Sequence, residues 1–286
     1  MSSQQAGRTA RGPGLIITAD DFGLHPSVNQ AVERAHREGV LSAASLMVGA
    51  PAAQDAIARA RDCPSLRVGL HLVLADGPSM LPPQTIPDLV DAGGRFGERM
   101  VRDGIRFFCL PRVRRQLALE IRAQFEAFSA SGLPLDHVNA HKHFHLHPTI
   151  LTLIIRIGRE FGLRAVRLPR EAGLPAWLRP WLALQQARLE AAGIGHNDYI
   201  VGLRQSGRFD EPALLAALRD LPPAGVGELY LHPALVSGAA IAASMPAYRH
   251  ADEFAALVSP RIRQACAQLR AKGFLFGGFA DLAWPA

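Results

Sequence analysis

Cysteine is scarce in this sequence, and its distribution excludes two kinds of structural site. The 286 residues include only Cys63, Cys109 and Cys266, which are odd in number, widely separated and without C-x-x-C spacing. This pattern predicts neither a disulfide framework nor a zinc site built from cysteine. It is typical of a protein that works in the reducing cytoplasm.

Long apolar runs are also missing. No segment approaches the roughly 18 uninterrupted apolar residues of a membrane-spanning helix, and the polar opening stretch lacks the apolar core of a signal peptide. We therefore expect a flexible tail over residues 1–13 and one cytoplasmic domain over residues 14–286. The lack of a spanning segment does not exclude peripheral contact with the inner membrane, because such contact needs no spanning segment.

Lysine is nearly absent, so the net charge of +6 comes almost wholly from arginine, with Lys142 and Lys272 the only lysines. A nucleic-acid-binding protein would carry a clustered basic stripe, or aromatic residues interleaved with basic ones. The densest cluster, Arg112, Arg114 and Arg115, opens a predicted amphipathic helix and is typical of a solvated face. We therefore expect no nucleic-acid partner.

Short apolar runs rich in β-branched residues alternate with amphipathic helical segments. The predicted strands are residues 15–19, 43–48, 66–72, 135–145, 165–168, 228–231 and 274–279, and the predicted helices are 27–38, 52–60, 113–129 and 260–272. This alternation predicts parallel strands in a single-domain, barrel-like α/β fold with its site at the carboxyl ends of the strands. The irregular stretch 75–104, rich in proline and glycine, is typical of a lid or binding loop.

Four histidines at two-residue spacing are the strongest chemical signal. His141, His143, His145 and His147 end the predicted strand 135–145 or follow it closely. In an extended segment alternate residues share a face, so Asn139, His141 and His143 would point the same way and two imidazoles could reach one ion. The alternative is that some of these histidines cap the next helix or pack in a polar crevice, and His145 and His147 fit it better.

Three other polar groups also stand where a predicted strand ends. They are the adjacent Asp20 and Asp21, then His71, and then His232 before Pro233. The carboxyl ends of parallel strands meet at one rim, so these groups should converge there. Two adjacent carboxylates repel one another, and a cation would keep both ionised. Imidazole and carboxylate ligands with an open position for water predict a divalent-metal hydrolase.

Four motifs resemble those of the YdjC-like carbohydrate deacetylases in order and spacing. They are residues 18–24 (TADDFGL), 69–72 (GLHL), 137–145 (HVNAHKHFH) and 228–233 (ELYLHP), and the resemblance extends over about residues 15–280. It implies a barrel of the glycoside hydrolase/deacetylase type. It also implies removal of an N-acetyl group from a sugar with the help of one divalent metal ion.

The resemblance assigns roles to individual residues. It implies that Asp21, His71 and His141 hold the metal, with His143 as the alternative third ligand, that Asp20 is the general base and that His232 is the acid. Zinc and magnesium are the favoured ions, and manganese and nickel remain open. Where the family usually has Asp-Ser-His, this chain has Asn139-Ala140-His141, and it has His232-Pro233-Ala234 in place of His-Pro-Gly.

Residues 43–51 and 138–147 resemble the hopanoid-biosynthesis branch of this family most. That resemblance implies an N-acetylglucosaminyl hopanoid as substrate, with a soluble N-acetylated oligosaccharide such as chitobiose as the alternative. The apolar residues within 105–110 and 174–184 would then either contact lipid or belong to an ordinary core. The sequence leaves both a monomer and a homodimer possible. A metal-storage protein is the rival class, but storage gives no reason for Asp20 and His232.

The assigned roles make a prediction for Asp20. An amide carbonyl is a poor electrophile, so hydrolysis needs a base for the attacking water and an acid for the departing amine. We expect Asp20→Asn to abolish turnover but to keep the bound metal, which acetate release and metal analysis of the same sample would measure. Loss of the metal from this variant would contradict the role of Asp20 as base.

Overall fold

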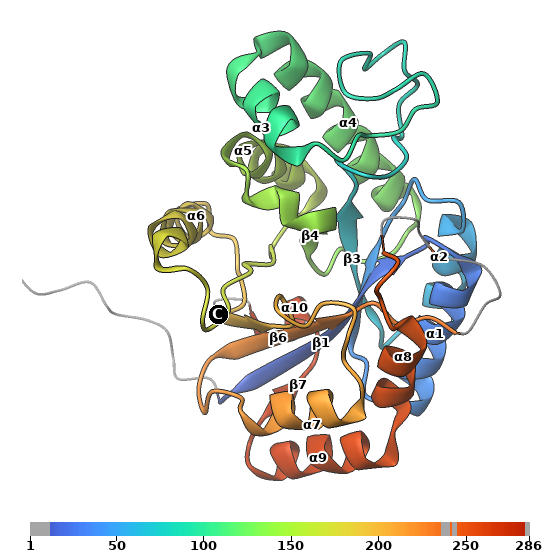
Figure 1. Ribbon diagram of the computed structural model, residues 1–286, viewed down its shortest axis with the longest axis vertical. Coiled ribbons are helices and arrows are strands. Elements are labelled where there is room, and N and C mark those ends of the chain that lie inside the picture. The colour runs from blue at the N-terminus through green and yellow to red at the C-terminus, as the bar shows by residue number, and fades with distance from the viewer. Residues whose placement is uncertain (1–11, 236–240, 242–244, 284–286) are drawn as a thin grey trace, which may run out of the picture.

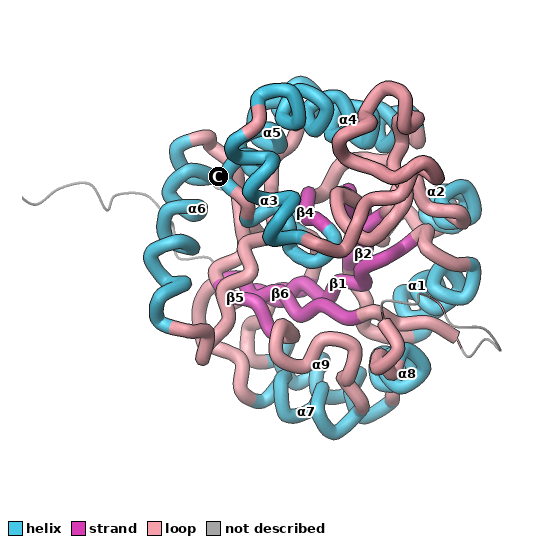
Figure 2. The backbone as a smooth tube through the Cα atoms, turned by 45° about the horizontal axis from the view of Figure 1, so that its top comes forward, coloured by secondary structure: helices cyan, strands magenta, loops and turns pink. Residues whose placement is uncertain are grey.

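The computed structural model describes residues 12–235, 241 and 245–283. Apart from Gly12 and Pro13, the predicted tail of residues 1–13 therefore lies outside the described residues. Parallel strands form the centre of the molecule, and helices surround them (Figures 1 and 2). This arrangement confirms the predicted α/β fold.

Among the described residues the sheet has seven strands, and every pair of neighbours in it is parallel. The strands are β1 (Gly14–Phe22), β2 (Ala43–Leu46), β3 (Arg67–Leu72), β4 (Val138–Ala140), β5 (Tyr199–Val201), β6 (Val226–Leu231) and β7 (Leu275–Phe276). They lie in the order β4-β3-β2-β1-β6-β5, with β7 paired to β1. All nine residues of β1 are buried, as expected for a parallel strand covered on both faces.

The sheet curls toward a barrel, as the sequence predicts. Single bridges join Val138 to Val166 and Ala165 to Gly195, which extends the strand neighbours from β4 toward β5. The predicted strand 165–168 is thus wrong as a full strand, because its segment makes only isolated bridges. Residues 165–168 nevertheless occupy the place of a strand between neighbouring strands, and Arg167 is buried there.

The helices cover the outside of the curled sheet (Figure 2). They are α1 (Pro26–Glu38), α2 (Ala53–Arg61), α3 (Met100–Cys109), α4 (Pro111–Ala130), α5 (Pro148–Gly158), α6 (Arg179–Ala191), α7 (Glu211–Arg219), α8 (His250–Val258), α9 (Pro260–Ala271) and α10 (Phe279–Leu282), with short 3-10 turns η1 (His141–Leu146), η2 (Arg159–Phe161) and η3 (Ala176–Leu178). Within the part of the chain described, none of them is both long and apolar enough to cross a bilayer.

The long irregular stretch is shorter than predicted, because α3 begins at Met100, inside the range 75–104. Buried side chains of α4 hold the loop that precedes α3. The Glu120 carboxylate accepts hydrogen bonds from the backbone N–H groups of Met80 and Leu81 at 2.8 and 3.0 Å, and Gln124 Oε1 accepts one from Val73 at 2.9 Å. The polar face of α4 thereby fixes the loop beside the carboxyl end of β3.

Glu120 should therefore stabilise this loop. Truncation in Glu120→Ala leaves two backbone donors without acceptors, so we expect about 1–3 kcal/mol of lost stability and faster amide exchange across residues 75–99. Urea unfolding and hydrogen exchange would measure the two effects. Leu119→Ala, an exposed neighbour on the same helix, is the control. Unchanged exchange at Met80 and Leu81 in the Glu120 variant would contradict this assignment.

Candidate metal centre

The end of β1 brings two adjacent carboxylates to one site. In a regular strand Asp20 and Asp21 would point to opposite faces. The pairing of β1 with β2 shifts register between Ala19 and Phe22, and Asp21 has a left-handed backbone with φ of 62°. Such a bulge re-aims a side chain. Both carboxylates are buried, and each has its own set of partners.

His71, near the end of β3, turns one ring nitrogen toward Asp21. Its Nε2 lies 3.3 Å from Asp21 Oδ1, and its Nδ1 lies 2.6 Å from Asn139 Oδ1. Because an amide oxygen can only accept, Nδ1 donates this hydrogen bond, and Nε2 is the nitrogen that faces Asp21. The Asn139 amide nitrogen donates in turn to Asp20 at 3.1 Å and to Ser45 Oγ at 2.9 Å. Asn139 therefore orients the imidazole and links it to the second carboxylate.

His141 reaches the same carboxylate from a turn rather than from a strand. The predicted strand 135–145 is wrong beyond residue 140, because β4 ends at Ala140 and η1 begins at His141. Lys142 and His143 have left-handed φ values of 56° and 55°. This turn brings His141 Nδ1 to 3.2 Å from Asp21 Oδ1.

Asp21, His71 and His141 together form a group that fits a metal ion. One ligand atom from each residue lies within 4.8 Å of the others, and all three residues are buried. Both Asp21 oxygens and His71 Nε2 are buried without a hydrogen-bond partner. Buried polar atoms are rarely left unpaired. A carboxylate with two imidazoles is a normal ligand set for a divalent ion with open positions for water.

The charge at this site also suits a cation. Burial alone would lower the pKa of His141, but the adjacent Asp21 carboxylate raises it to about 9. The same imidazole and the proximity of His71 hold the pKa of Asp21 well below its usual range, although burial opposes this. Without a metal, a proton on His141 therefore supplies the positive charge that Asp21 needs. A divalent ion would replace that proton.

His143 lies outside this group of three. The expectation that His141 and His143 share one face assumed an extended backbone, which the left-handed turn replaces. His143 Nε2 instead lies 3.3 Å from the hydroxyl of Tyr230. His145 Nδ1 accepts a hydrogen bond from the backbone of Ala140 at 3.1 Å, so His145 stabilises the turn.

Asp20 is held by a buried ion-pair network. Arg167 donates to its two oxygens at 2.5 and 3.0 Å and to those of Glu228 at 2.8 and 2.7 Å. Thr18 adds a hydrogen bond to Glu228 at 2.8 Å. Burial alone would raise the pKa of Asp20, but the Arg167 guanidinium holds it far below its usual range. Asp20 is therefore ionised in the folded protein.

His232 follows β6, and its ring is close enough to both aspartates to interact with their charges. Its backbone N–H donates to the buried Glu253 carboxylate at 2.5 Å, and its Nδ1 is buried without a partner. The rings of Tyr230 and Tyr248 pack edge-on against it at 5.6 and 4.9 Å between centroids. Burial lowers the pKa of His232 to about 4, although Asp21 and Asp20 act in the opposite direction.

The loop after β3 also contributes to the site. Asp76 Oδ2 lies 2.7 Å from Lys142 Nζ and 3.9 Å from His141 Nε2. It stands beyond His141, on the side of the ring away from Asp21, where a carboxylate can orient the imidazole. The sequence comparison with the family pointed instead to a missing carboxylate at Asn139. Asp76 comes from the loop that was predicted to form a lid.

Sequence reasoning missed Arg167 as a partner of the site. It lies in the apolar run Ala165-Val166-Arg167-Leu168, and an arginine in a buried run requires a carboxylate partner. This pattern could have predicted a buried ion pair for Arg167. It could not have identified the carboxylates, because they lie on strands far away in the sequence. Asn139 was predicted to share a strand face with His141 and His143, but no partner was predicted for its side chain.

The role of Asn139 can be measured directly. Truncation in Asn139→Ala removes the acceptor of the His71 proton, so we expect zinc affinity to fall about 10- to 100-fold, as measured by titration calorimetry. Asn197→Ala is the matched control, because Asn197 is also buried but binds the backbone of Leu168 and Tyr199. Equal loss of affinity in both variants would contradict the assignment.

The chain is similar to known proteins over most of its length. The carbohydrate deacetylase of Brevibacillus brevis is 32% identical over 255 residues, which cover 87% of this chain and 93% of that protein. The chitooligosaccharide deacetylase of Yersinia pestis (strain Pestoides F) is 30% identical over 271 residues, which cover 93% and 98%.

A solved structure shares the fold. A protein of Enterococcus faecalis V583, provisionally named for cellobiose-phosphate cleavage, superimposes with a TM-score of 0.75 at 24% identity, over 96% of this chain and 100% of that one. The model of the YdjC-like protein family matches residues 14–268, a range that includes every residue of the candidate site. This chain therefore belongs to the YdjC-like family.

Proposed function

We propose that this protein is a metal-dependent carbohydrate deacetylase that hydrolyses the N-acetyl group of an acetylamino sugar. The observation that carries the proposal is the buried group of Asp21, His71 and His141, with unpartnered ligand atoms, beside the ionised Asp20. The names of the relatives from Brevibacillus brevis and Yersinia pestis support the same reaction class.

A divalent ion bound by Asp21, His71 and His141 would polarise the acetyl carbonyl and acidify the attacking water. Asp20 is suited to accept the proton of that water. Its Oδ2 receives one hydrogen bond from Arg167 and retains a second electron pair. Because Glu228 also binds Arg167, the guanidinium keeps a carboxylate partner when the charge at position 20 is removed.

His232 supplies the proton that the departing amine needs. In the free site burial lowers the pKa of His232 to about 4, so the imidazole is neutral at neutral pH. Negative charge that develops on the acetyl oxygen during attack would favour the protonated ring, which would take up the proton that Asp20 accepts from the attacking water. The imidazolium can then donate to the amine nitrogen as the carbon–nitrogen bond breaks. The buried position of His232 keeps that proton away from bulk solvent.

For the substrate we propose an N-acetylglucosaminyl hopanoid. The resemblance of residues 43–51 and 138–147 to the hopanoid-associated branch supports it, and so do the exposed apolar residues of α3. The second candidate is a soluble N-acetylated oligosaccharide such as chitobiose, which the names of the relatives favour. Both substrates present the same acetylamino group to the site, so they differ in what the sugar is attached to.

Acetate release from the two substrates tests the proposal. Enzyme reconstituted with zinc or magnesium should release acetate from N-acetylglucosaminyl bacteriohopanetetrol, and EDTA should abolish the release because Asp21, His71 and His141 then lack their ion. Release from chitobiose alone would transfer the assignment to soluble sugars. Metal binding without release from either substrate would contradict deacetylation.

A further inference from the structure

The outer face of α3 is apolar and has no partner within the described chain. Val101, Ile105 and Phe108 are 81%, 60% and 58% exposed and lie at helical spacing on one side. Leu110, which follows the helix, is 45% exposed. A contiguous apolar stripe of this kind marks an interaction surface more often than isolated apolar residues do.

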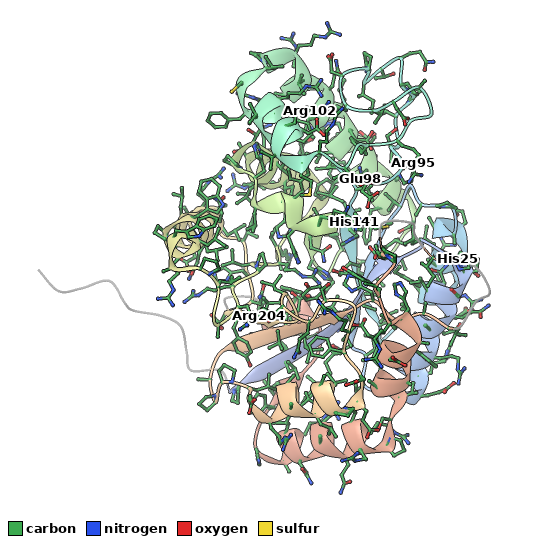
Figure 3. The ribbon with its side chains drawn as sticks, in the orientation of Figure 1. His25, Arg95, Glu98, Arg102, His141 and Arg204 are labelled. Atoms are coloured by element: carbon green, nitrogen blue, oxygen red, sulfur yellow. The ribbon has the colours of Figure 1, made fainter. Side chains whose placement is uncertain are left out.

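Arginines surround this stripe. Residues 99–115 include Arg99, Arg102, Arg106, Arg112, Arg114 and Arg115, with Asp103 as the single acidic residue. Asp103 itself is paired with Arg102 at 2.9 Å and with Arg106 at 3.3 Å. Arg102 is labelled on α3 in Figure 3. Arg112 is paired with Asp88 at 2.7 Å, and the arginines around the stripe still outnumber the acidic groups.

A groove next to the stripe is lined by arginines and by no acidic residue among those described. Phe108 lines it together with Arg114, Arg156 and Arg188, which come from α4, α5 and α6. None of the described residues that line this groove carries a carboxylate. The chemistry that this surface fits is an apolar layer covered by anionic groups.

The inner face of the same helix supports the metal centre. The ring of Phe107 lies 5.5 Å from that of Phe144 and 6.1 Å from that of His147, between centroids. Phe144 belongs to η1, the turn that begins with His141. One helix thus separates the exposed stripe from the segment that carries a candidate metal ligand.

We propose that the outer face of α3 and its arginines dock this protein on the surface of an anionic phospholipid bilayer. The apolar stripe would enter the boundary of the acyl chains, and the arginines would contact lipid phosphates. A second copy of the chain fits this face less well, because a two-fold interface would bring the same arginines together. The proposal goes beyond the proposed reaction and does not depend on the sugar substrate.

Sedimentation with vesicles tests the docking. We expect the protein to bind vesicles that contain phosphatidylglycerol and to bind vesicles of phosphatidylcholine alone far less. The triple variant Val101→Ser/Ile105→Ser/Phe108→Ser should weaken binding at least about tenfold, since it removes the apolar area that would become buried in the bilayer. Leu275→Ser, which changes a 51% exposed leucine on β7, should bind like the parent protein.

A pair of charge reversals tests the arginines separately. Arg114→Glu/Arg156→Glu should also weaken binding at least about tenfold, because each basic group near an anionic surface contributes roughly fivefold. Arg263→Glu/Lys272→Glu makes the same change of net charge on exposed residues of α9 or adjoining it, and it should retain binding. Equal losses of binding in both double variants would mean that binding depends on the net charge of the protein and not on these arginines. That outcome would overturn the proposal.

Two further measurements separate docking from other causes. Deacetylation of chitobiose, or zinc affinity if chitobiose is not a substrate, should be unchanged in the α3 variants, because the mutated side chains are exposed. Light scattering without lipid should give the same oligomeric state for parent and variants. Absent vesicle binding, or a dimer that the α3 substitutions dissociate, would overturn the proposal.

Discussion

The buried guanidinium of Arg167 is the interaction on which the site depends. It is fully buried and binds two carboxylates, Asp20 and Glu228, which come from adjacent strands. Removing Arg167 would leave both buried carboxylates without a counter-charge, and breaking a buried ion pair in this way costs about 3–5 kcal/mol. The same pairing keeps Asp20 ionised in an interior where burial would otherwise favour the protonated acid. Through Asn139 the network then reaches His71, so the base and the metal centre share one hydrogen-bonded frame.

Backbone strain is concentrated at this frame. Among the described residues, the non-glycine positions with positive φ are Asp21, Asp76, Lys142 and His143. Each such conformation costs on the order of 1–3 kcal/mol and persists only where the surroundings determine it. Asp21 turns out of its strand toward the imidazoles, while Asp76 and Lys142 pair beside His141. The strain therefore has a chemical use, since it brings a strand end, a loop and a turn to one point.

The α3 helix connects this centre to the surface. Phe107 packs against the turn that carries His141, and Val101 and Ile105 on the opposite side face solvent. The loop before α3 is held by Glu120 and also carries Asp76. An enzyme acting on a sugar that is attached to a lipid would need such a short connection between bilayer and catalytic groups.

The strand ends that carry polar groups can be identified from the pattern of residues alone, because parallel strands bring their carboxyl ends to one rim whatever their lengths. The strand ends predicted Asp20, Asp21, His71 and His232 as site residues, and the two-residue spacing of the histidines predicted His141. The alternation of strands and helices predicted the α/β fold. The three-dimensional fold was needed to distinguish His141 from His143, since a left-handed turn replaces the strand after Ala140 and brings His141 to Asp21. It also decided the partner of Asp20, because Arg167 lies 147 positions away. Local patterns describe alternation and spacing, whereas such pairings arise only when distant segments pack together.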